Sequence, residues 1–177
     1  MILSLTNRQV SSLIEETKRK HPVESCGLLF GWITEEEAVV KKIAETRNVL
    51  ESSSEFQINP EEFIKHISEA EREGLQLIGF YHSHPADPKP SMIDVKYMKL
   101  WPESIWLIIS SIDYSMGAYQ MVNEKFVKID VKVSGSIDDS SYKKHPNQQD
   151  RNGRIPEEDT NLKIHCYLLI HPAAEDS

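Results

Sequence analysis

Two histidines separated by one residue, His82 and His84, are followed after a short loop by an aspartate, Asp94. Imidazole nitrogens and carboxylate oxygens are common ligands of zinc. Three protein ligands leave a fourth position for water, which distinguishes a catalytic zinc site from a closed structural one. Residues two apart on a strand point to the same side, so both imidazoles can reach one ion. The pattern therefore predicts a catalytic metal site.

Two further residues could act beside such a metal. Glu24 lies in an apolar segment, where its carboxyl group could transfer protons. Ser91 and Asp94 form a Ser-x-x-Asp pattern, which by itself is more often only a helix cap. Any single histidine is likewise more often a packing or surface residue. The functional interpretation depends on the combination of the histidine pair, the proline-rich loop and the Ser-x-x-Asp pattern.

Helix and strand signals alternate along the chain and predict an α+β fold. Helices are predicted to begin at Thr6, at Asn59 before Pro60, and at Ser91, because each is a favourable N-cap residue. The strand over 75–81 leads into His82, and Asp94 falls in the first turn of the helix after it. The other predicted strands are 1–5, 27–33, 38–44, 104–111, 116–122, 126–133 and 162–170.

Composition favours one globular domain over residues 1–177. The net charge of −8 argues against a nucleic-acid partner, and no apolar run is long enough to cross a membrane. We therefore expect a cytoplasmic protein. Cys26 and Cys166 form no Cys-x-x-Cys motif. The polar segment 134–160 is predicted to be a flexible insertion loop.

The combination of motifs resembles the JAMM, or MPN+, metalloprotease family. That family combines an upstream glutamate, His-Ser/Thr-His-Pro and Ser-x-x-Asp. Here the pattern is matched by Glu24, His82-Ser83-His84-Pro85, Ser91 and Asp94, within a resemblance that covers about residues 1–133. The loop between Pro85 and Ser91 is one residue shorter than is usual in the family, so its path is the point at which this chain departs from the pattern.

The resemblance implies an MPN (cytidine deaminase-like) fold, with a mixed, largely antiparallel sheet flanked by two or three helices. It implies that His82, His84 and Asp94 bind one catalytic Zn²⁺ with a bound water. By the same resemblance, Glu24 transfers protons and Ser91 donates a hydrogen bond to the oxyanion.

The implied activity is zinc-dependent isopeptide or peptide hydrolysis after the C-terminal tail of ubiquitin or a ubiquitin-like protein. The chain resembles archaeal stand-alone deubiquitinase-like members related to the proteasome-lid deubiquitinase, so a proteasome or an AAA+ unfoldase is a candidate partner. Residues 45–57 are a candidate flank of the substrate groove. The alternatives are a peptidase that processes small sulfur-carrier proteins of the ubiquitin fold and a non-catalytic MPN scaffold.

Overall fold

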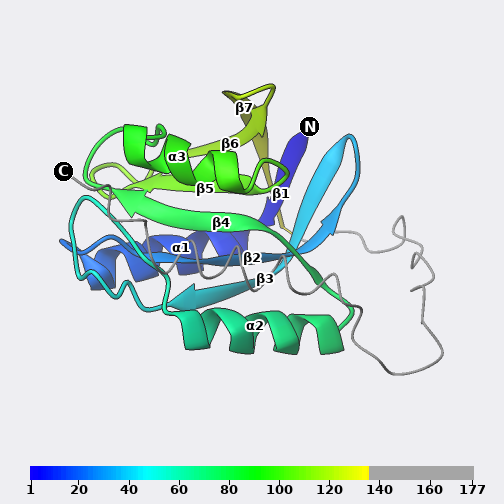
Figure 1. The fold of residues 1–177 in the computed structure, drawn as a ribbon, viewed down its shortest axis with the longest axis horizontal. Helices are drawn as coiled ribbons and strands as arrows, with labels where there is room; N and C mark the ends of the chain where they lie inside the picture. Colours follow the sequence, from blue (N-terminus) through cyan, green and yellow to red (C-terminus); the bar gives the residue numbers. More distant parts are fainter. Residues whose placement is uncertain (136–177) are drawn as a thin grey trace, which may run out of the picture.

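The computed structural model describes residues 1–135, which form a seven-stranded mixed sheet with three helices (Figure 1). This confirms the predicted α+β class. The helices are α1 (Asn7–Lys20), α2 (Pro60–Arg72) and α3 (Met92–Leu100). The strands are β1 (Ile2–Thr6), β2 (Cys26–Ile33), β3 (Glu37–Thr46), β4 (Gln76–His84), β5 (Ile105–Ser110), β6 (Met116–Val122) and β7 (Lys125–Ser134).

The strands close into a barrel in the order β1-β3-β2-β4-β5-β6-β7. β1 pairs in parallel with both β3 and β7, and β4 pairs in parallel with β5, while the remaining pairs are antiparallel. β2 and β3 form an antiparallel hairpin, and β5, β6 and β7 form an antiparallel run, so these strands agree with the predicted ranges to within a few residues. β4 is longer than predicted, because it continues through His82 to His84.

All three helices begin where the sequence predicts, because a side chain satisfies N–H groups that the first turn leaves unpaired. Thr6 and Gln9 form a capping box at the start of α1. Asn59 accepts hydrogen bonds from two backbone N–H groups of α2. Ser91 and Asp94 form a second capping box, which sets the position of Asp94 in the first turn of α3.

Two apolar clusters pack on opposite sides of β2. Leu28 and Phe30 join a cluster that includes residues of α2 and α3, whereas Leu29 between them joins a cluster with Leu13 of α1. Because β4 pairs with β2, successive side chains at the carboxyl end of β4 also point alternately to these two sides. None of the helices within residues 1–135 is long and apolar enough to cross a membrane.

The predicted loop 134–160, apart from its first two residues, and the predicted strand 162–170 lie outside the described residues. A single domain over residues 1–177 accordingly stays a prediction.

Candidate metal centre

Three predicted ligands converge at the end of β4 and the start of α3. The Nε2 atoms of His82 and His84 are 2.9 Å apart. Asp94 Oδ1 lies 3.2 Å from His82 Nε2, and Asp94 Oδ2 lies 3.2 Å from His84 Nε2. Bonds of about 2.0–2.1 Å to a tetrahedral zinc would place its donors roughly 3.3 Å apart. The measured distances are close to this separation, with each imidazole next to a different oxygen of Asp94, and the three residues form a group that could hold a metal.

Burial and mutual contacts set the charge of the three donors. All three side chains are buried. Burial lowers the pKa of His82, which favours the neutral imidazole that binds metals. Burial also opposes the charged form of His84, but Asp94 and Glu24 raise its pKa above the usual value. For Asp94 burial acts to raise the pKa, and hydrogen bonds from His82 and His84 hold it well below the usual value, so its carboxylate is ionised.

Glu24 lies immediately before β2, which pairs with β4 in the register Cys26 to His82. The Ser83 N–H donates to the Ser25 carbonyl at 2.9 Å, which continues this pairing by one residue toward Glu24 and His84. The Glu24 side chain is only 3% exposed, and burial raises its pKa to about 7, with His84 lowering it and Asp94 raising it. A carboxyl group that titrates near neutral pH is suited to accept and return a proton.

Ser91 lies at the N-cap of α3, directly beside the aspartate ligand. Its N–H donates to Asp94 Oδ2 at 2.6 Å, and its hydroxyl oxygen accepts from the Asp94 N–H at 3.1 Å. The first of these bonds orients the carboxylate that completes the triangle of donors. The serine hydroxyl only accepts in this box, so its own O–H can still donate to another group.

The short loop between His84 and Ser91 is anchored at Pro88. The Tyr119 hydroxyl donates to the Pro88 carbonyl at 2.9 Å. A Cβ on Gly117 would lie 2.3 Å from the same carbonyl oxygen, so only glycine permits this approach. The loop is one residue shorter than in the pattern that the sequence resembles, and Asp94 still lies against both histidines.

Comparison with known proteins agrees with this geometry. Residues 6–125 match the family described as prokaryotic homologs of the JAB domain. The chain belongs to this family. The predicted resemblance to JAMM (MPN+) proteins is thereby confirmed at the level of the JAB domain.

Curated relatives of this JAB-domain protein include two desampylases. That of Pyrococcus furiosus is 42% identical over 114 residues, which are 63% of this chain and 75% of the relative. That of Haloferax volcanii is 33% identical over 118 residues, which are 63% of this chain and 79% of the relative.

Two solved structures resemble the JAB domain in fold. A solution structure from Desulfitobacterium hafniense superposes with a TM-score of 0.70 at 22% identity, covering 81% of this chain and 99% of that one. A JAB1/MPN domain protein from Archaeoglobus fulgidus gives a TM-score of 0.50 at 19% identity, covering 76% and 99%. They confirm the MPN fold.

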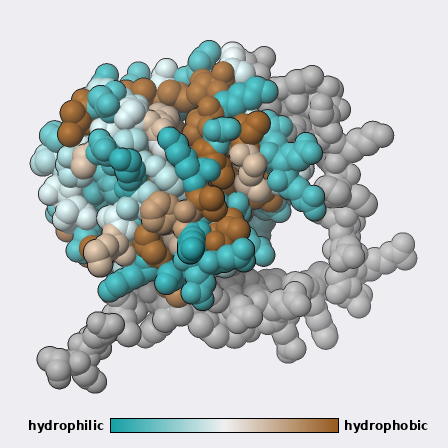
Figure 2. Space-filling model, turned by 90° about the horizontal axis from the view of Figure 1, so that it is seen from above, coloured by the Kyte–Doolittle hydropathy of each residue, from teal (hydrophilic) through white to brown (hydrophobic). Residues whose placement is uncertain are grey.

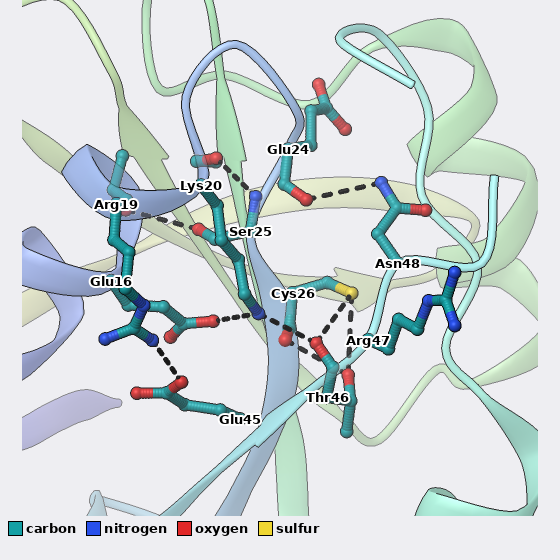
Figure 3. Close-up of polar contacts among 12 residues, drawn as sticks. Glu16, Arg19, Lys20, Glu24, Ser25, Cys26, Glu45, Thr46, Arg47 and Asn48 are labelled. Atoms are coloured by element: carbon teal, nitrogen blue, oxygen red, sulfur yellow. Dashed lines mark hydrogen bonds and ion pairs between the residues drawn. The ribbon is translucent and has the colours of Figure 1, made fainter. Parts of the chain in front are cut away.

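Two residues of the loop between β3 and α2 contact this JAB-domain site, and both lie in the segment 45–57 that was predicted as a candidate flank of the substrate groove. Phe56 stacks on His82, with ring centroids 4.5 Å apart. The Asn48 side chain is buried and donates to the Glu24 carbonyl at 3.2 Å (Figure 3). Its amide oxygen accepts from the N–H groups of Leu50 and Gln57. Neither Asn48 nor Phe56 was predicted as a site residue, because amide and aromatic side chains in a serine-rich stretch carry no periodic signal that indicates their contacts.

The side of β4 away from the imidazoles is supported by a buried glutamate of α1. Glu16 is 1% exposed and accepts from the Tyr81 hydroxyl at 2.5 Å and from the Lys20 ammonium at 2.6 Å. Lys20 also donates to the Thr46 carbonyl, so the helix is tied to β3 as well as to β4 (Figure 3). Hydrophobic periodicity along α1 gives no indication that Glu16 is buried.

Proposed function

We propose that this chain is a zinc-dependent isopeptidase that cleaves after the C-terminal tail of a ubiquitin-like protein. The observation that carries the proposal is the buried triangle of His82, His84 and Asp94, with the Glu24 carboxyl group at the adjoining strand end. The names of the two desampylases support removal of a ubiquitin-like modifier from a conjugate. Membership of the JAB-domain family supports hydrolysis at the same site.

Each residue of the site has a distinct part in the proposed reaction. A zinc ion held by the three donors would lower the pKa of its bound water toward about 7 and polarise the scissile carbonyl. Glu24 takes up a proton from the attacking water and returns it to the leaving amine. Ser91 donates a hydrogen bond to the developing oxyanion, which is worth about 3 kcal/mol for one such donor.

A protein substrate is consistent with the apolar side chains that are exposed on the same side of the molecule as α3. Met92, which follows Ser91, is 85% exposed. Figure 2 shows a band of apolar side chains crossing the face seen from above, the side on which α3 lies in Figure 1. Exposed apolar side chains that lie together are typical of surfaces that bind other proteins.

The proposal extends to a cytoplasmic enzyme that works with a proteasome or an AAA+ unfoldase. Co-purification of the chain with such a partner is the test.

The decisive experiment incubates the zinc-loaded chain with fusions in which a ubiquitin-like protein precedes a reporter. Mass spectrometry then identifies the bond that is cut. We expect cleavage after the ubiquitin-like tail, loss of cleavage with a chelator, and loss of cleavage in Glu24→Gln with zinc still bound. Wild-type turnover in Glu24→Gln would contradict the proposed proton transfer.

The metal ligands have their own test, which also separates an enzyme from a scaffold. His84→Ala removes one of three donors and is expected to abolish stoichiometric zinc binding in the purified protein. If the wild-type chain bound no zinc and cut no fusion, the scaffold alternative would replace the enzyme.

A further inference from the structure

The backbone that carries Glu24 is joined to β4 by a reciprocal pair of hydrogen bonds. The Ser83 N–H donates to the Ser25 carbonyl at 2.9 Å, and the Ser25 N–H donates to the Ser83 hydroxyl oxygen at 2.8 Å. Ser25 is fully buried and Ser83 is 3% exposed. The residue between the two histidines therefore contacts the residue next to the glutamate.

The Ser83 side chain lies on the side of β4 opposite to the imidazoles. Alternation along the strand places His82 and His84 on one side and Ser83 on the other. There the Ser25 hydroxyl is 3.2 Å from the Thr17 hydroxyl of α1, and Thr17 in turn donates to the Leu13 carbonyl. Ser83 thus belongs to the contact between the two strands and α1, and its hydroxyl takes no place among the metal donors.

The peptide groups of Glu24 itself are also held by hydrogen bonds. Its N–H donates to the Ser52 carbonyl at 2.9 Å, and its carbonyl accepts from the Asn48 amide at 3.2 Å (Figure 3). In the same view the Glu24 side chain extends away from the Asn48 amide. The backbone contacts therefore leave the carboxyl group available while they restrict where it can lie.

We infer that Ser83 is a positioning residue. Its hydroxyl fixes the backbone of Glu24 relative to His82 and His84, which flank Ser83 in the sequence. The inference rests on the proposed function. Without the hydroxyl, the Ser25 N–H loses its acceptor in a fully buried place, and the segment that carries Glu24 must shift or open to satisfy it. A displacement of about 1 Å in a catalytic group can lower the rate about a hundredfold.

The test compares Ser83→Ala, Ser83→Cys and Ser83→Thr. In Ser83→Ala we expect kcat to fall about tenfold to a hundredfold, with KM and zinc stoichiometry unchanged. Ser83→Thr keeps the hydroxyl on a strand and should restore kcat, and Ser83→Cys, with a weak acceptor, should lie between them. In the metal-free protein, the Ser25 amide should exchange with solvent faster in Ser83→Ala than in the wild type.

The matched control is Thr6→Ala, which removes another hydroxyl that accepts a backbone N–H, at the cap of α1. It should lower thermal stability without changing kcat. Wild-type kcat in Ser83→Ala, or a failure of Ser83→Thr to restore it, would overturn the inference. If the wild-type chain cut no fusion, only the proposed function would be contradicted. The positioning role would then be tested by amide exchange alone, and equal exchange of the Ser25 amide in the wild type and Ser83→Ala would overturn it.

Discussion

Phe56 stacks on the ring of His82, with the ring centroids 4.5 Å apart and the planes 24° from parallel. His82 Nδ1 is buried and has no hydrogen-bond partner within residues 1–135. Metal-binding histidines usually donate this second N–H to an oxygen atom, which sets the orientation of the ring. In this centre the stacked ring of Phe56, rather than a hydrogen bond to Nδ1, restricts the orientation of the His82 ring.

Replacing this aromatic ring should therefore weaken the metal site. We expect Phe56→Ala to reduce zinc affinity about tenfold, in the range of other outer contacts of metal ligands. Competition with a chromogenic chelator measures the change. Val127→Ala is the control for truncation of an apolar side chain, because Val127 is exposed on β7. Equal zinc affinities for the wild type and Phe56→Ala would show that burial alone holds His82 in place.

The features that local chemistry determines were predicted correctly from sequence. Thr6, Asn59 and Ser91 begin their helices because each side chain bonds N–H groups within the next turn. The convergence of His82 and His84 was also predicted, because residues two apart on a strand point to the same side. The roles of Glu24 and Ser91 stay predictions, although the structure places both beside the donors.

Features that depend on contacts between distant segments were not predicted. The parallel pairing of β1 with β7, which closes the barrel, joins the two ends of the described chain. Asn48 and Phe56 gain their importance only when their loop folds against β2 and β4. Glu16 falls on a buried face because Lys20 and Tyr81 satisfy its carboxylate, and hydrophobic periodicity cannot reveal such a partner.

The close approach of Gly117 to Pro88 makes the short loop sensitive to a single methyl group. Gly117→Ala must displace the loop, because the new Cβ would lie 2.3 Å from the Pro88 carbonyl oxygen. We expect a loss of about 1–3 kcal/mol in the free energy of unfolding, together with weaker zinc binding. Urea unfolding and zinc titration measure the two effects.

Tyr119→Phe is the companion variant, since it removes the hydrogen bond to Pro88 without pushing the loop. Its expected cost is only about 1 kcal/mol. If Gly117→Ala were no more disruptive than Tyr119→Phe, the loop would be able to move freely, and its path would not determine the position of Asp94.

The buried carboxyl group of Glu24 predicts a pH-dependent stability in the metal-free protein. Burial raises its pKa from 4.5 to about 7. The folded state therefore holds the proton more tightly than the unfolded state, so the stabilisation is complete below about pH 4.5 and is lost as the pH rises through about 7. A rise in pKa from 4.5 to about 7 corresponds to at most about 3.4 kcal/mol of the free energy of unfolding.

The measurement is urea unfolding of the wild type and Glu24→Gln from pH 4.5 to 8 in the presence of a chelator. Glutamine stays neutral throughout, so the variant should gain stability relative to the wild type as the pH rises. Glu103→Gln reports the general effect of removing one exposed carboxylate. Parallel pH profiles for the wild type and Glu24→Gln would show that Glu24 does not titrate in this range.

Ser91 combines a structural role with a proposed catalytic role, and two substitutions can separate them. Ser91→Ala removes the cap of α3, which should cost about 1 kcal/mol of stability, and also removes the proposed oxyanion donor. Ser91→Gly is a nearly neutral change at an N-cap, costing only a few tenths of a kcal/mol relative to serine, but it lacks the hydroxyl as well. Both variants should therefore lose turnover by about a hundredfold to a thousandfold, whereas only Ser91→Ala loses appreciable stability. Thermal unfolding and kcat on a ubiquitin-like fusion measure the two properties. A Ser91→Gly variant with wild-type turnover would assign Ser91 to the helix cap alone, because the cap is the one role that glycine preserves.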